Sequence, residues 1–456
     1  MKFAILRDFF YRLHLWLGLA SGLILFVVCL SGSLYVFRNE ARQLAAPELF
    51  YVEATADQRL SADEIVAKVE AARPGKKVGS LTIPESPTRT VAVVLNDAPK
   101  KGGAGAQKGE TKNSGEKAKK SGKIGGKHRG EMVYVDPYTG AIVGKGATPV
   151  DEFFGFLMKL HRWLCIPTEI GSPIVGVATL IYVVLTLTGL LLWLPRTAAA
   201  WRRKSTWKTA LNVRVRRGGW PLVFDLHNAL GFYTLLPALI LALTGLCWSF
   251  GWYRDAVGAV LGEAPFKAKR EQPEALTPPD GSPRPATLEE LIARHNELDP
   301  GAGDVTISIP QDESTATTIQ KGRVDGFFAL AVKNKTQWDR LDASVVSVER
   351  YGKTVEVERF ADKPFGAKIA SSIRALHLGE ITGLSSKIFF FVVCLIATSF
   401  PATGVALWAH KLRARNKKRQ AQTDGDAASN SNRETGDAAS NADRKSADET
   451  PTQETV

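Results

Sequence analysis

Four long apolar windows limit the folds open to this chain more than any other feature of its sequence. They cover roughly residues 13–37, 174–194, 229–250 and 386–409. Each is about as long as the ~20 apolar residues that a helix needs to cross a hydrocarbon core of ~30 Å. The first window is longer than the apolar core of a cleaved signal peptide, about 7–15 residues, so we interpret it as a retained span. The sequence therefore predicts an α-helical membrane protein with four transmembrane helices.

The distribution of positive charge predicts how these spans are oriented. The 456 residues include 59 Lys and Arg against 46 Asp and Glu, which gives a net charge of +13. The excess gathers near the N-terminus, between the second and third windows, and directly after the fourth window. Because flanks rich in Lys and Arg stay in the cytoplasm, we expect both termini there. The charge thus reports topology in a lipid bilayer, and we expect no nucleic acid partner.

The expected topology divides the chain into eight segments. They are residues 1–37 (basic N-terminus and first span), 38–151 (first outward domain), 152–194 (interfacial segment and second span), 195–226 (basic cytoplasmic link), 227–250 (third span), 251–370 (second outward domain), 371–410 (interfacial segment and fourth span) and 411–456 (basic, then disordered, cytoplasmic tail). Both outward domains have the mixed helical and strand-like patterns of small α+β modules, including a capped helix over 61–72. Inside the first, the Lys/Gly/Ser-rich tract 100–130 is expected to be a disordered loop.

A Leu-His pair recurs at the expected entrance to every membrane segment, at His14, His161, His227 and His377. Each span also ends on a Ser/Thr-Gly step, in "LSGSL" (30–34), "LTGLLLW" (187–193), "LTGLCW" (243–248) and "ATGVALW" (402–408). His14 and His227 are 213 residues apart, and His161 and His377 are 216 residues apart. The agreement predicts an internal duplication, with two tandem repeats of span, outward domain and span.

The duplication predicts where the histidines lie. Both repeats insert in the same orientation because each holds an even number of spans. His14 and His227 are then equivalent at the cytoplasmic edge, and each is 18 residues, about 27 Å of helix, from the Gly of its own span. His161 and His377 are equivalent at the outward edge. We therefore expect two pairs of imidazoles at two depths.

The outward histidines need a break between themselves and the spans that follow. The 28 residues from His161 to the Gly of its span would run about 42 Å as one helix, too long for a straight crossing. Pro167 and Pro173 allow a break, and Gly379 and Gly383 serve the fourth span in the same way. Residues 152–165 are expected to form an amphipathic segment at the outer interface that carries His161 inward.

Two imidazoles per site favour one cofactor over the alternatives. A haem iron with two axial imidazoles has no open position and suits electron transfer. Gly18 and Gly22 share a helix face that a flat macrocycle could approach, although such a pair more often serves helix packing. A lone interfacial histidine is usually only a polar tip at the headgroups, and His410, which has no counterpart in the first repeat, is interpreted in that way.

With these motifs in view, the chain resembles the PepSY-associated transmembrane family of bacterial inner-membrane proteins. The resemblance covers about residues 5–412 and is carried by "VYVDPYTGAIVG" (133–144) together with the four Leu-His pairs. It implies that the outward domains are PepSY-like, the second one diverged. The family includes haem-containing siderophore-iron reductases. The resemblance therefore implies two b-type haems held by His14, His161, His227 and His377, with ferric siderophore as the acceptor.

Three functional hypotheses remain open at this point. The first is a ferric-chelate oxidoreductase that carries electrons across the inner membrane to a ferric siderophore or another chelate in the periplasm. Its donor must be separate, a cytoplasmic flavin reductase or quinol, because the chain has no dinucleotide-binding GxGxxG motif. The second is a non-redox PepSY protein that regulates by binding a ligand or peptidase. The third, a siderophore permease with histidine proton relays, ranks last because four spans give a narrow pathway.

Overall fold

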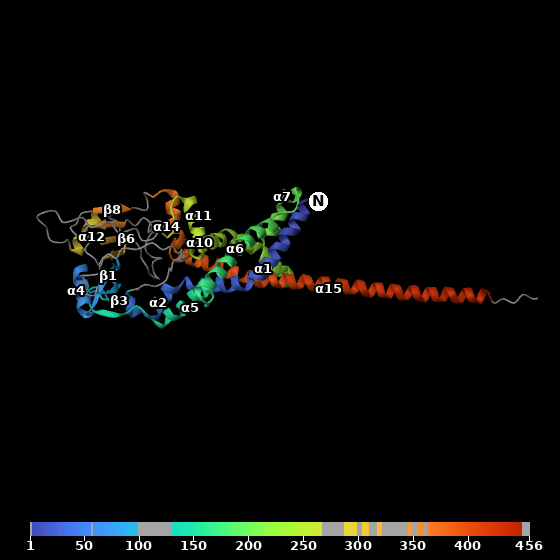
Figure 1. Ribbon diagram of the computed structural model, residues 1–456, viewed down its shortest axis with the longest axis horizontal. Coiled ribbons are helices and arrows are strands. Elements are labelled where there is room, and N and C mark those ends of the chain that lie inside the picture. Colours follow the sequence, from blue (N-terminus) through green and yellow to red (C-terminus); the bar gives the residue numbers. More distant parts are fainter. Residues whose placement is uncertain are drawn as a thin grey trace, which may run out of the picture. The chain divides into compact units, whose positions relative to one another are not determined.

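The computed structural model describes residues 2–55, 58–98, 130–266, 287–298, 303–309, 317–321, 345–348, 354–358 and 363–448, most of them helical (Figure 1). All but the last residue of the tract 100–130 lie outside this range. The chain forms two compact units. Unit 1 comprises Met1–Phe26, Val184–Leu235 and Ile396–Val456, and unit 2 comprises Val27–Val183 and Leu236–Leu395.

Among the described residues, four helical stretches are long and apolar enough to cross a membrane, as the sequence predicts. They are α1 (Lys2–Tyr35), α6 (Thr168–Trp193), the continuous run of α9 (Gly219–Asp225), η2 (Leu226–Leu230) and α10 (Gly231–Ser249), and α15 (Leu384–Asp448). The protein is thus a membrane protein with four candidate spans.

Two helices extend past the ends of the expected spans. Helix α1 begins at Lys2, so the helix that carries His14 starts before this residue. Helix α15 continues to Asp448, whereas disorder is predicted from about residue 420. The tail is polar, but it is rich in Ala, Lys, Arg and Gln and has no proline before Pro451. Such a composition favours helix as much as disorder, and polarity alone does not separate the two.

The predicted breaks before the second and fourth spans are confirmed. Helix α5 (Pro149–Trp163) ends at two left-handed residues, Leu164 (φ 56°) and Cys165 (φ 58°), and α6 begins directly after Pro167. Pro173 instead lies inside α6. This break lets the amphipathic helix α5 end before the span α6 begins, so the two helices need not share one axis.

Glycines make the corresponding break before α15. Helix α14 (Phe365–His377) is followed by Gly379 (φ 67°) and Gly383 (φ 73°), both in the left-handed region that favours glycine. His377 is therefore the last residue of α14, and His161 lies in the last turn of α5.

Unit 2 contains an antiparallel sheet of eight strands (Figure 1). In chain order these are β1 (Lys76–Ile83), β2 (Val91–Asp97), β3 (Glu131–Val135), β4 (Ile142–Lys145), β5 (Val305–Ser308), β6 (Thr317–Lys321), β7 (Val345–Val348) and β8 (Thr354–Glu358). Their spatial order is β4-β3-β2-β1-β5-β6-β7-β8. The two segments that the sequence predicts to be outward domains therefore share one sheet in the described residues and do not form two separate domains. The central β1–β5 pairing removes the edge that each four-stranded half would otherwise expose.

The sheet and two helices enclose one hydrophobic core. Helix α4 (Ala62–Ala72) begins with a capping box at Ser61, as predicted, and buries Ile65 and Val69 against the strands. Helix α12 (Leu288–Leu298) buries Leu291 in the same core. Its His295 is fully buried as well, although it lies on a helix of mostly polar composition.

The remaining described helices are short. They are α2 (Arg38–Ala45), α3 (Pro47–Phe50), α7 (Ala198–Trp201), α8 (Lys204–Leu211), η1 (Val215–Arg217) and α11 (Gly251–Leu261). Asp151 near the start of α5 accepts from Arg38 at 2.6 Å and from Arg42 at 3.0 Å. This pair of ion contacts joins α2 to the helix that carries His161.

Because β1 and β5 pair in one sheet, two cysteines introduced at opposed positions of these strands should form a disulfide. Thr82 in β1 and Thr306 in β5 are direct cross-strand partners, and their Oγ1 atoms lie 3.0 Å apart. Directly opposed strand residues fall within the Cα separation of about 4.4–6.8 Å that a disulfide requires. We expect Thr82→Cys/Thr306→Cys to crosslink on mild oxidation, as detected by mass spectrometry of linked tryptic peptides.

A matched variant tests the register of that pairing. Ser308 is on the same face of β5 but opposes Ser80, so Thr82→Cys/Ser308→Cys places the thiols diagonally, about 7–8 Å apart. Equal crosslinking of both variants would contradict the register, and no crosslinking of either would contradict the shared sheet.

Candidate functional site

The four predicted histidines divide equally between the two units. Unit 1 holds His14 on α1 and His227 on η2, and unit 2 holds His161 on α5 and His377 on α14. Each pair joins one histidine from each half of the sequence.

His14 is held by a threonine of α6. Its Nδ1 lies 2.9 Å from Oγ1 of Thr188, and that hydroxyl donates its own proton to the carbonyl of Val184 at 2.8 Å. A hydroxyl has a single proton, so the contact with His14 is one in which Nδ1–H donates and Oγ1 accepts. In the neutral ring Nε2 then carries a lone pair.

His227 repeats this arrangement with a threonine of α15. Its Nδ1 lies 2.8 Å from Oγ1 of Thr403, which donates to the carbonyl of Ser399 at 3.1 Å. The ring sits in a π-helical turn, a feature that often occurs at functional sites. Just before it, buried Asp225 accepts from Arg214 at 2.6 and 2.8 Å, and this ion pair anchors the start of the turn.

The histidines of unit 2 use backbone carbonyls. Nδ1 of His161 donates to the carbonyl of Val28 at 2.8 Å. The hydroxyl of Ser31 donates to the carbonyl of Val27 at 2.6 Å, with a longer contact of 3.2 Å to that of Val28. Nδ1 of His377 contacts the carbonyl of Leu241 and Oγ1 of Thr244, both at 3.1 Å. A carbonyl only accepts, so Nδ1 carries the proton in both rings. In each of these contacts the imidazole nitrogen is Nδ1.

A glycine lies beside each ring, next in sequence to the Ser or Thr. A Cβ on each glycine would approach Cε1 of one imidazole, at 2.7 Å for Gly32 and His161, 3.0 Å for Gly245 and His377, 3.4 Å for Gly189 and His14, and 3.7 Å for Gly404 and His227. One histidine ring therefore packs against each of the four Ser/Thr-Gly steps of the sequence, and we call each step the seat of that histidine. Sequence reasoning noticed these steps but interpreted them only as span ends. Their equal number with the Leu-His pairs was the signal for this second role.

The rings within each pair are near one another. The centroids of His161 and His377 lie 6.1 Å apart, with the ring planes at 51°. A metal bound at about 2 Å by one nitrogen of each of two opposed imidazoles puts the centroids about 6 Å apart. His14 and His227 are close enough for a direct electrostatic interaction.

Burial keeps the unit 2 histidines neutral. It lowers the pKa of His161, and it lowers the pKa of His377 to about 3, to which the neighbouring His161 also contributes. Both rings are half-buried and belong to helices outside the four candidate spans. A neutral imidazole is the form that ligates a metal.

This donor set fits haem better than a bare metal ion. In the part of the chain that the structure describes, no group of three or more His, Cys, Asp or Glu side chains gathers to hold a metal. Two imidazoles alone suit a metal that brings its other ligands, as haem iron does. The anchored Nδ1–H groups match the usual outer contacts of metal-ligating histidines.

The other residues singled out by the sequence have different surroundings. A Cβ on Gly22 would lie 3.3 Å from Cβ of Pro401, so this glycine serves close helix packing. Gly18 has more room, because a Cβ there would meet only Leu185 Cδ2, at 3.8 Å. His410 is exposed and lies over Trp220 at 4.4 Å between centroids, away from any Ser/Thr-Gly step.

Comparison with known proteins agrees with this arrangement of spans. No curated protein matches the sequence. The family described as the PepSY-associated TM region matches residues 11–411, which include the four histidines and the four apolar windows of the sequence. The chain belongs to the PepSY-associated TM region family.

Proposed function

We propose that the protein is a di-haem electron carrier that reduces a ferric chelate across a bacterial inner membrane. One observation carries the proposal. Four imidazoles occur as two pairs, each with Nδ1–H fixed by a hydroxyl or carbonyl, which leaves Nε2 as the metal-binding atom of a neutral ring. A pair that only packed would have no need of a common tautomer.

Each pair has a defined part in this proposal. His14 and His227 would hold one b-type haem, and His161 and His377 the other. A haem at each pair would supply a reversible Fe(III)/Fe(II) couple. The protein supplies ring orientation, through threonine hydroxyls for His14 and His227 and through backbone carbonyls for His161 and His377.

Sequence spacing supports two haems at different depths. His14 and Gly32 are 18 residues apart, as are His227 and Gly245, and 18 helical residues correspond to about 27 Å. The equal spacing and the match between histidine distances also support two tandem repeats and two PepSY-like outward segments.

Charge supports the direction of transfer. The basic flanks around residues 196–217 and 411–419 favour a cytoplasmic location for those segments and for both termini. Electrons would then come from a separate cytoplasmic flavin reductase or from quinol. They would leave to a ferric siderophore or related chelate in the periplasm, one electron for each iron. Reduction to Fe(II) weakens binding by hard oxygen ligands and so releases the metal.

The second candidate is a non-redox PepSY protein that regulates by binding a ligand or peptidase. Its supporting observation is the shared eight-stranded sheet, whose size is large for a domain that only covers a cofactor. The colour of the purified protein distinguishes the two proposals, because only the first requires bound haem, which absorbs visible light.

The first prediction of the proposal is the number of haems. Protein purified from haem-replete cells should show an intense Soret band that shifts on dithionite reduction, with about two haems per chain. His14→Ala and His161→Ala should each lose one haem, because each removes one of two axial ligands, and the two variants should lose spectrally different haems. Pyridine haemochrome titration measures the content.

His410→Ala is the matched control, since His410 is an exposed histidine at the end of the same bundle of apolar helices. It should keep both haems. A colourless wild-type preparation would rule out the di-haem proposal and favour the regulator.

A second prediction concerns the glycines beside the rings. Gly32→Ala should cost the His161/His377 haem, because its Cβ would lie 2.7 Å from Cε1 of His161. Gly404→Ala should be tolerated, because its Cβ would lie 3.7 Å from His227, an ordinary contact. Haem content measured beside Gly155→Ala, which has open space around it, provides the baseline. Equal losses in Gly32→Ala and Gly404→Ala would contradict the seating.

A third prediction concerns the threonine acceptors. Thr188→Val leaves Nδ1–H of His14 without its acceptor, so the imidazole donates less electron density and the midpoint potential of one haem should rise. Haem affinity should fall about 10–100-fold. Thr244→Val should do less, because His377 keeps the carbonyl of Leu241. Redox potentiometry measures the midpoint potentials of both variants, and haem transfer to apomyoglobin compares their haem affinities.

Thr179→Val is the control for the threonine variants. Thr179 is also on α6 and its hydroxyl also donates to a carbonyl of its own helix, that of Val175. It should leave both potentials unchanged, whereas Thr188→Ser should restore the wild-type value. Identical behaviour of Thr188→Val and Thr179→Val would refute the role of the Thr188 acceptor.

A further inference from the structure

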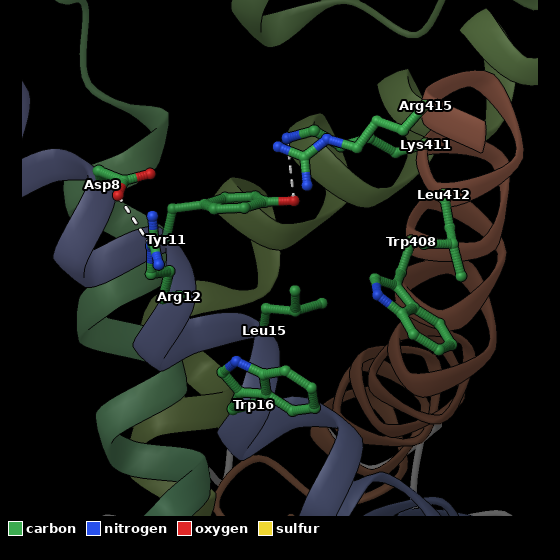
Figure 2. A pocket seen from close by; sticks show the side chains of 9 residues that line it. All are labelled: Asp8, Tyr11, Arg12, Leu15, Trp16, Trp408, Lys411, Leu412 and Arg415. Atoms are coloured by element: carbon green, nitrogen blue, oxygen red, sulfur yellow. Dashed lines mark hydrogen bonds and ion pairs between the residues drawn. The ribbon is translucent and has the colours of Figure 1, made fainter. Parts of the chain in front are cut away.

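A pocket in unit 1 lies between the start of α1 and the part of α15 that follows the fourth apolar window (Figure 2). Its volume is about 260 Å³. Helix α1 contributes Asp8, Tyr11, Arg12, Leu15 and Trp16, and α15 contributes Trp408, Lys411, Leu412 and Arg415. The spacings within both sets are those of one helix face. Figure 2 shows the charged side chains at one end and the tryptophans at the other.

The charges of the pocket do not balance. Arg12 is neutralised by Asp8 at 2.8 Å. Lys411 instead donates to the hydroxyl of Tyr11 at 3.1 Å and lies 4.2 Å from the centre of that ring. Among the described residues, neither Lys411 nor Arg415 has a carboxylate partner. The pocket therefore has two cations without a carboxylate partner in the described part of the chain, Lys411 and Arg415, next to the apolar side chains of Leu15, Trp16 and Trp408. A ligand with two negative charges and an apolar part would match these side chains.

The pocket continues the face of α15 on which His227 rests. Gly404, which lies against the His227 ring, is four and seven residues before Trp408 and Lys411, so the three share one face. At 1.5 Å per residue Lys411 is about 10 Å along the helix from Gly404. That is near the reach of a haem propionate from an iron bound at His227. On α1, His14 lies in the sequence between Arg12 and Leu15, which both line the pocket.

We propose that this pocket binds the two propionate carboxylates of the haem held by His14 and His227, a proposal that rests on the proposed function. Lys411 and Arg415 pair with the carboxylates in charge-assisted hydrogen bonds. Leu15 and Trp408 contact the adjoining edge of the macrocycle. A neutral quinol headgroup would leave both cations unmatched. An anionic lipid headgroup has similar charge, and the test separates it.

The test uses the full-length holoprotein and the double variant Lys411→Gln/Arg415→Gln. Removing positive charge beside the carboxylates favours Fe(III), so the midpoint potential of one haem should fall while the other stays constant. The same haem should transfer to apomyoglobin faster, about tenfold for each cation removed. The haem affected should be the one that His227→Ala loses.

Arg413→Gln/Lys417→Gln is the matched control, because it removes the same charge from exposed positions on the opposite face of α15. It should change neither potential nor transfer rate, and Lys411→Arg/Arg415→Lys should restore both. Unchanged haem properties in Lys411→Gln/Arg415→Gln would overturn the propionate site. Loss of co-purifying phosphatidylglycerol in that case would identify a lipid site instead. A colourless wild type would defeat the proposed function itself, a result distinct from either.

Discussion

The hydrogen bond from Nδ1 of each histidine is the interaction on which the candidate site depends. A neutral imidazole has one proton and two nitrogens, so fixing the proton on Nδ1 decides that Nε2 is the donor atom. In unit 1 the acceptor is a threonine hydroxyl already committed to its own helix, and in unit 2 it is a backbone carbonyl. Without these contacts each ring could rotate or change tautomer, and the closeness of two rings would not decide which nitrogen can bind a metal.

The contacts also explain why glycine follows each Ser or Thr. An imidazole whose Nδ1 reaches the hydroxyl or carbonyl of a neighbouring helix must lie flat against that helix, and a Cβ there would intrude, most severely at Gly32. Each seat lies within one half of the sequence, such as Thr188 for His14 and Thr403 for His227, whereas each proposed iron joins the two halves. In the proposed duplication, each repeat would orient its own ligands and the cofactor would hold the repeats together.

Sequence reasoning predicted the parts of this structure that depend on local pattern. Four spans follow from apolar length, and the breaks before α6 and α15 follow from Pro167 and from Gly379 and Gly383. What it missed depends on contacts between distant segments. The β1–β5 pairing, the burial of His295 and the acceptor role of Thr188 each need two parts of the chain brought together. Spacing within one segment does not encode such contacts.

The acceptors of the four histidines give neither proposed haem site a clear advantage, and this bears on the direction of electron flow. The carbonyls of Val28 and Leu241 also accept from the hydroxyls of Ser31 and Thr244. The hydroxyls of Thr188 and Thr403 are polarised because they donate to carbonyls of their own helices. A more basic axial ligand would stabilise Fe(III) and lower the reduction potential, but these contacts do not make one pair of imidazoles the more basic. Outward flow would then be driven by the strength of the cytoplasmic donor and by removal of Fe(II) from the chelate, and not by a potential gradient built into the histidines.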